Sequence, residues 1–106
     1  MVHEIDHAEL KDMIDSDERF ILLDVRDEPE YNKGHLPGAL HLLISDMDEK
    51  AKQMLDKNLP VVTDLEDYNC PASTIVAEKL EQMGFTTMDY KGSYQDWVDH
   101  KYSVET

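Results

Sequence analysis

Short apolar runs alternate along this chain with longer segments in which apolar residues recur every three or four positions. Residues 20–25 are apolar except for Asp24. This run is too short for a helix, so it predicts a parallel strand buried on both faces. Val61 and Val62 predict a second buried strand, and residues 40–43 and 86–90 predict two more.

Amphipathic segments between these runs predict the helices. Asp6 and Glu9 have the spacing of a capping box, which opens a helix that runs to about Ile14. Further helices are expected over residues 27–34, from Ser45 to about Leu55, over residues 71–83, and from Ser93 as the cap of a last short helix. In the helix over residues 71–83, the apolar stripe consists of Ala72, Ile75, Val76, Leu80 and Met83.

The order of these elements predicts the fold class. Because strands alternate with helices, we expect an α/β layered fold with a mostly parallel sheet. Ligands of such sheets bind beyond the carboxyl ends of the strands. The loop after Val62 is therefore the expected place for chemistry.

Charge excludes several classes of partner. Lys and Arg total 10 against 24 Asp and Glu, which gives a net charge of −14 over 106 residues. Such a surface repels phosphate backbones and anionic lipid, so we expect neither nucleic acid nor a membrane as partner. A basic protein partner stays open, although a solvated exterior is the simpler interpretation. The length is that of one domain, expected to span residues 1–106.

The single cysteine and the absence of targeting signals favour a cytoplasmic protein. Cys70 is the only cysteine, so no internal disulfide can form. No apolar run approaches the ~20 residues of a membrane span. The first ten residues, MVHEIDHAEL, are acidic and lack the apolar stretch of a signal peptide.

Three segments together resemble one known family. Residues 24–39 read DVRDEPEYNKGHLPGA, residues 70–85 read CPASTIVAEKLEQMGF, and residues 90–97 read YKGSYQDW. They resemble the rhodanese-like domains, which are built around a cysteine that carries sulfane sulfur. In the third segment, Ser93 stands where the family has the second glycine of a Gly-Gly-x-x-x-Trp ending. The resemblance implies a three-layer fold, with a central sheet of about five strands flanked by helices.

The resemblance also implies roles for particular residues. In the family, the active loop joins a strand to a helix, and its amide groups surround the sulfur of a nucleophilic cysteine at the loop's first position. Ser73 holds the Ser or Thr position that ends this loop. Asp24, Arg26 and His35 are expected to brace the first motif by hydrogen bonds, as structural residues.

The cysteine on which the family depends is absent from its usual position. The commonest loop length puts it near Asp67, and a longer-loop subgroup puts it at Asp64, Leu65 or Glu66. The longer pattern suits this chain better, because its second cysteine corresponds to Cys70 in an intact Cys-Pro-Ala-Ser. Cys70 precedes a proline at a plausible first helical position, where unpaired amide groups favour a thiolate.

Two hypotheses for function follow. In the first, Cys70 is the nucleophile of a sulfurtransferase or persulfide carrier, which serves a small sulfur donor or a thiol acceptor protein and needs no cofactor. The residues expected to bind the substrate are Leu65, Glu66, Asp67, Tyr68, Asn69 and Ser73. In the second, Cys70 is a small loop residue, and the chain is a catalytically inactive binding or regulatory module.

Local charge favours the second hypothesis. Asp64, Glu66 and Asp67 disfavour a thiolate, and no Lys or Arg lies between Lys57 and Lys79. A cysteine phosphatase is excluded, since both arginines lie far upstream of the loop. The histidines lack the spacing of metal ligands, so no metal site is expected.

Overall fold

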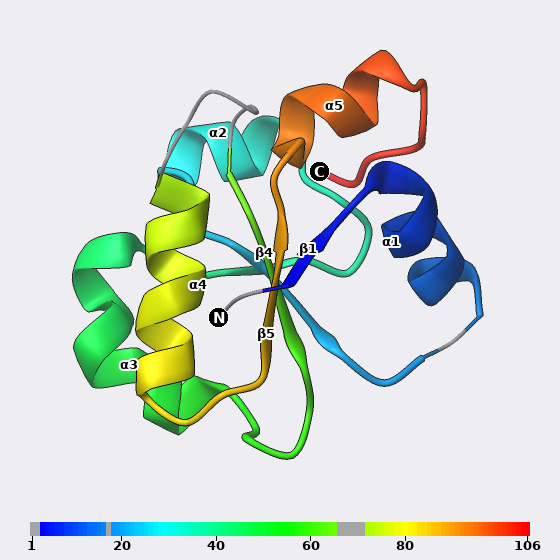
Figure 1. Cartoon of the computed structure of the whole chain (residues 1–106). Coiled ribbons are helices and arrows are strands. Elements are labelled where there is room, and N and C mark those ends of the chain that lie inside the picture. The colour runs from blue at the N-terminus through cyan, green and yellow to red at the C-terminus, as the bar shows by residue number, and fades with distance from the viewer. Residues whose placement is uncertain (1–2, 17, 66–71) are drawn as a thin grey trace.

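The computed structural model describes residues 3–16, 18–65 and 72–106 (Figure 1). Within these ranges, five strands form one parallel sheet in the order β1-β5-β4-β2-β3. The strands are β1 (His3–Ile5), β2 (Ile21–Asp24), β3 (Leu40–His41), β4 (Val61–Asp64) and β5 (Thr87–Tyr90). The prediction of an α/β fold with a parallel sheet is confirmed.

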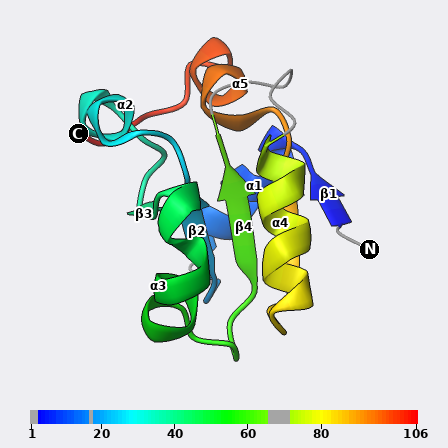
Figure 2. The same cartoon turned by 90° about the vertical axis from the view of Figure 1, so that its left-hand side faces the viewer.

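Helices cover both faces of the sheet and make three layers. They are α1 (His7–Asp15), α2 (Glu28–Lys33), α3 (Met47–Met54), α4 (Ala72–Gln82) and α5 (Ser93–Asp99), and a short 3-10 turn, η1 (Ile44–Asp46), precedes α3. In Figure 1, α3 and α4 lie on one side of the sheet, and α1 and α5 lie on the other. Figure 2 shows α3 and α4 side by side in front of β2 and β4.

Two apolar cores lie against the two faces of the sheet. Leu23 and Val61 point toward α3 and α4, where they pack with Met47, Val76 and Leu80. Leu22 and Val62, their neighbours along the strands, point to the opposite face and pack with Leu10, Tyr90 and Trp97. Because every residue of β2 and β4 is buried, neither strand shows the alternation of a half-exposed strand.

The first helix begins as its sequence predicts. The Asp6 carboxylate accepts a hydrogen bond from the Glu9 amide at 2.8 Å, and the Glu9 carboxylate accepts one from the Asp6 amide at 3.3 Å. This reciprocal capping box pairs two amide groups at the helix start. It also fixes where the chain turns from β1 into α1.

Two details of the helices predicted over residues 45–55 and 71–83 are wrong. The α-helix expected to open at Ser45 begins at Met47, because residues 44–46 form the 3-10 turn. Ile75 is 60% exposed and does not belong to the buried stripe of α4. The sheet contacts the side of α4 that carries Val76 and Ala77, and Ile75 lies about 100° round the helix from Val76 on the other side.

Candidate active site at the carboxyl end of the sheet

The last residues of β4 lead into the predicted active loop. Asp64 ends the strand with no exposed surface, and its Cα is paired in register with that of Asp24. Leu65 follows, and its side chain packs into the core between the sheet, α3 and α4. Adjacent side chains therefore point to opposite faces, and neither faces solvent.

The backbone of Leu65 is held by the start of α5. Its N–H donates to the Ser93 hydroxyl at 2.9 Å, and its carbonyl accepts from the Tyr94 N–H at 3.1 Å. Both hydrogen-bonding groups of the residue are thus engaged by consecutive residues of another segment. We call these two bonds the Leu65 clamp.

Ser93 occupies a backbone conformation that suits glycine. Its φ is +60°, its surface is fully buried, and its hydroxyl donates to the Tyr90 carbonyl at 3.0 Å. The left-handed conformation costs an L-residue roughly 1–2 kcal/mol. Each hydrogen bond of the hydroxyl stabilises the folded state by about 1 kcal/mol, which offsets this cost. The prediction that Ser93 caps α5 is wrong, because Gly92 holds the N-cap position and the Ser93 hydroxyl bonds Leu65 and Tyr90 instead.

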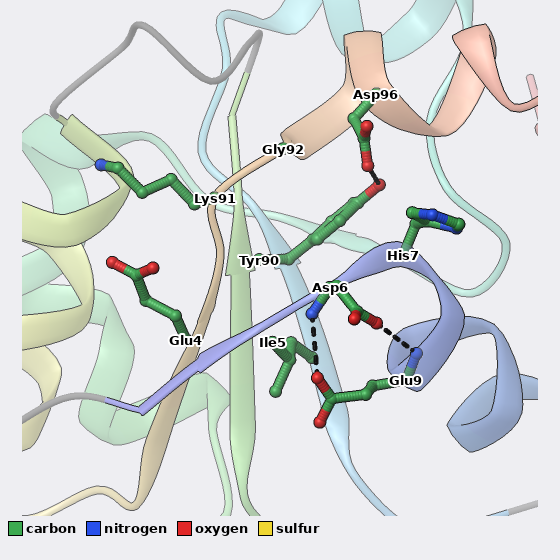
Figure 3. Close-up of a pocket in the computed structure, with 9 residues that line it drawn as sticks. All are labelled: Glu4, Ile5, Asp6, His7, Glu9, Tyr90, Lys91, Gly92 and Asp96. Carbon is green, nitrogen blue, oxygen red and sulfur yellow. Dashed lines mark hydrogen bonds between the residues drawn. The ribbon is translucent and has the colours of Figure 1, made fainter.

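On the other side of the loop, hydrogen bonds hold the start of α4. The Thr74 hydroxyl donates to Asp89 Oδ2 at 2.7 Å, and Lys91 Nζ donates to the same hydroxyl at 3.0 Å. Figure 3 shows Lys91 extending away from its neighbours toward α4. The segment from Tyr90 to Tyr94 thus contacts the chain on both sides of residues 66–71.

Lys91 is a cation that sequence reasoning missed. The sequence was searched for basic residues only in the loop's own segment, between Lys57 and Lys79. In the folded chain, Lys91 reaches α4 from the end of β5. Buried Asp89 lies on the far side of the Thr74 hydroxyl and offsets part of this positive charge.

Most of the predicted site lies outside the described residues. This applies to Glu66, Asp67, Tyr68, Asn69 and Cys70. Ser73 belongs to the first turn of α4 by its backbone. The roles proposed for these residues stay predictions.

The first motif forms a buried brace beside the Leu65 clamp. The Arg26 guanidinium donates to both oxygens of the Asp24 carboxylate, at 2.8 to 3.1 Å, and also to the Gly34 carbonyl. It lies 4.1 Å from the ring centroid of Tyr94, a cation–π contact. Arg26 thereby connects the motif to the residue whose amide holds Leu65.

His35 braces the same motif through other partners. Its ring stacks on the Tyr31 ring at 3.9 Å, and its Nδ1 lies 2.9 Å from the Tyr31 carbonyl. Its backbone forms a two-bond bridge with Glu105 near the C-terminus. Burial, with nearby Asp24, raises the pKa of Tyr31. The phenol therefore stays protonated as donor to the Ala39 carbonyl.

A cavity of about 360 Å³ lies beside β1 and the start of α5 (Figure 3). Its walls carry four carboxylates together with His7 and Lys91. Asp6 and Glu9 form the capping box, and the Tyr90 hydroxyl donates to Asp96 Oδ2 at 2.6 Å. Throughout the described ranges, no three His, Cys, Asp or Glu side chains gather as metal ligands.

Comparison with known proteins decides the family. The model of the rhodanese-like domain family matches residues 6–100. The chain belongs to the rhodanese-like domain family. This rhodanese-like domain is 33% identical over 99 residues to the putative sulfurtransferase YtwF of Bacillus subtilis (strain 168), with 91% of this chain and 90% of that protein covered.

Two further similarities extend the comparison. The domain is 36% identical over 98 residues to the putative sulfur carrier protein YrkF of Bacillus subtilis (strain 168). That match covers 92% of this chain and 51% of YrkF, so the chain spans about half of that relative. The crystal structure of the BH2092 protein from Bacillus halodurans superposes with a TM-score of 0.89 at 29% identity, covering 97% of this chain and 76% of that chain.

The longer-loop pattern puts the family's usual cysteine at position 64, 65 or 66. Positions 64 and 65 lie in described parts of this rhodanese-like domain. Asp64 is fully buried at the end of β4, and Leu65 packs in the core. Neither side chain carries the thiol that sulfur transfer in this family uses. Among the described residues, no helix is both long and apolar enough to cross a bilayer.

Proposed function

We propose that this rhodanese-like domain is a sulfurtransferase or persulfide carrier in which Cys70 holds the sulfur. The observation that carries the proposal is a set of hydrogen bonds that hold the chain on both sides of residues 66–71, which we call the frame. Leu65 is held by Ser93 and Tyr94, and the start of α4 is held through Thr74. The names of YtwF and YrkF support sulfur chemistry of this kind.

The proposed transfer has two displacement steps. The Cys70 thiolate attacks the outer sulfur of a donor such as thiosulfate. A Cys70 S–S bond forms, the donor's own S–S bond breaks, and sulfite leaves with the electron pair. The thiolate of an acceptor protein then attacks the outer sulfur of the persulfide, and Cys70 leaves as a thiolate.

The backbone amides of the loop would hold the anionic sulfur. The Leu65 N–H is already donated to Ser93, so it is not available for this role. The amides that remain belong to residues 66–69 and to the start of α4, where a helix has unpaired N–H groups. Glu66, Asp67, Tyr68, Asn69 and Ser73 stay the proposed substrate-binding residues.

Asp64 favours a second candidate function, that of an inactive binding or regulatory module. A buried carboxylate ends the strand at one of the positions where the family carries its cysteine. Its negative charge opposes an anionic sulfur nearby. In this case the domain would keep the scaffold and bind a partner without turnover.

Intact-mass measurement separates the two candidates. After incubation with thiosulfate, mercaptopyruvate or a persulfide donor, we expect a mass gain of one sulfur atom. The gain should disappear on reduction and in Cys70→Ser. No gain with any donor would favour the binding module.

Two cysteine substitutions test whether the fold supports sulfur transfer when the thiol stands at another position. Asp64→Cys puts a thiol at the end of β4 without touching the apolar core on the α3 and α4 side. Leu65→Cys is the matched control, since it removes buried apolar volume from that core. Transfer gained by Asp64→Cys in a Cys70→Ser background would show that the frame supports sulfur transfer by a thiol at the end of β4.

A further inference from the structure

The strand β1 leaves one edge of the sheet open. It is the terminal strand in the order β1-β5-β4-β2-β3, and its residues pair with residues 88–90 of β5. Figure 2 shows β1 at the outer side of the sheet, and no strand in the described ranges pairs with its other edge. His3 and Glu4 are exposed there. The outer edge of such a strand presents N–H and C=O groups that another extended chain can bond.

The cavity of about 360 Å³ lies at the carboxyl end of this same edge (Figure 3). Its walls come from β1, from the start of α1 and from the segment that follows β5. Figure 3 shows Asp6 and Glu9 on the α1 side of the strands. Glu4 and Lys91 extend toward the α4 side. A chain that continued the sheet beyond β1 would point its side chains alternately to these two sides.

The α1 side of the cavity is negatively charged. The Asp6 and Glu9 carboxylates accept hydrogen bonds from backbone amides, and Asp96 Oδ2 accepts from a tyrosine hydroxyl. These donors are neutral, so they do not cancel the charge of a carboxylate. The His100 ring, whose Nδ1 lies 3.4 Å from Asp96 Oδ1, is a cation only when protonated. Lys91 is the one Lys or Arg among the residues that line the cavity, and it extends to the α4 side.

We infer that the β1 edge and this cavity dock an extended basic segment of a partner protein, which adds to the sheet as a strand beside β1. Main-chain hydrogen bonds to the edge supply affinity, and a Lys or Arg side chain that enters the cavity on the α1 side supplies specificity. Charge complementarity selects this occupant, because the acidic wall favours a cation. The inference depends neither on Cys70 nor on sulfur transfer.

A second copy of this chain is another occupant that an open edge invites. It would bring the same carboxylates to the interface, on a chain whose net charge is −14. Like charges placed across an interface oppose association. The charge of the cavity therefore favours a basic partner over self-association.

The probe is a capped hexapeptide in which arginine alternates with valine, so that every arginine points to one side of the strand. Titration of the 106-residue chain is followed by the NMR shifts of its amides. We expect the largest shifts at residues 3–9 and 90–96, which surround the edge and the cavity, and weaker binding as salt is raised.

Two matched peptides isolate the two features of the proposal. Glutamine in place of arginine removes the charge and keeps the main chain. Ester links in place of the amide links remove the main-chain donors and keep the arginines. Each matched peptide should bind about tenfold more weakly than the arginine peptide.

A triple variant removes the charge from the protein instead, and it consists of Asp6→Asn, Glu9→Gln and Asp96→Asn. Asn is as good an N-cap as Asp, and Gln serves in a capping box as Glu does, so the start of α1 is kept. The triple variant should bind the arginine peptide about tenfold more weakly. The control makes the same change of net charge at three exposed positions on α2 and α3, away from β1, and should bind within about twofold of wild type. Its substitutions are Asp27→Asn, Glu28→Gln and Glu49→Gln.

Several outcomes would overturn the proposal. Equal affinity for the arginine and glutamine peptides would show that charge does not select the ligand, and equal affinity for the ester peptide would show that no strand is added. A dimer in sedimentation of the free chain, with the β1 amides protected from exchange, would show that a second copy occupies the edge. Competition by spermidine at the affinity of the peptide would show that the cavity takes an amine alone. Because these measurements use the wild-type chain, they decide the proposal even if the triple variant fails to fold.

Discussion

Replacing Arg26 by methionine should destabilise the domain more than any single change at its surface. Arg26 is 5% exposed, and its guanidinium donates to both oxygens of Asp24, which is fully buried. Methionine keeps much of the buried volume and removes the charge. The Asp24 carboxylate would then keep its bond from the amide of residue 26 but lose its counter-charge, and the Gly34 carbonyl would lose a donor.

The expected cost follows from these contacts. Removing one partner of a buried ion pair costs about 3–5 kcal/mol, because the remaining charge is desolvated without compensation. Loss of the cation–π contact with Tyr94 adds roughly 0.5–2 kcal/mol. A domain of this size has a total stability of about 5–15 kcal/mol. The melting temperature should therefore fall by about 15 °C or more, since each kcal/mol shifts it by about 4 °C or more.

Urea and thermal unfolding followed by circular dichroism measure this effect. Arg19→Met is the control, since it removes the chain's other arginine from an exposed position. Adding Asp24→Asn to Arg26→Met should recover part of the loss, because the uncompensated charge is gone. A loss under about 1 kcal/mol in Arg26→Met, or a double variant no more stable than the single one, would refute the argument from desolvation.

Two further predictions concern stability. Burial, and then the hydrogen bond to Asp96, raise the pKa of Tyr90 above its unfolded value of about 10. The stability that Tyr90 contributes is therefore complete below about pH 10, and it falls by about 1.4 kcal/mol per pH unit above that. Urea unfolding of Tyr90→Phe should show a shallower alkaline loss, and an identical slope would contradict the assignment. Gly38→Ala should cost about 1–2 kcal/mol in thermal unfolding. Gly38 has a φ of +78° with open space where a Cβ would lie, so the cost is purely one of backbone conformation, and an unchanged melting temperature would refute it.

The central strands could be predicted because burial on both faces leaves a strong local signal, whereas β1, exposed at two of its three residues, was missed. Residues 20–25 contain every residue of β2, and residues 86–90 contain all of β5. The first helix was equally predictable, since a capping box is a contact between residues three apart. Ile75 was misassigned because helical spacing alone does not say which side of an apolar stripe the sheet will contact.

The frame of the candidate site could not be predicted, because its contacts join distant segments. Ser93 and Leu65 are 28 residues apart, and Lys91 and Thr74 are 17 residues apart. One local sign did mark Ser93, namely a serine where the family resemblance places glycine. No local sign marked Lys91, because the carboxyl ends of β4 and β5 become neighbours only in the folded sheet.

Charge around the start of α4 bears on which proposed function is correct. The Lys91 ammonium and the Asp89 carboxylate bond opposite sides of one Thr74 hydroxyl, so much of the positive charge is balanced locally. Asp89 Oδ1 accepts no hydrogen bond from the described residues, so within them this carboxylate is bonded through Oδ2, to the Thr74 hydroxyl. Stabilisation of an anionic Cys70 would therefore have to come mainly from backbone amides, whose effect depends on their direction.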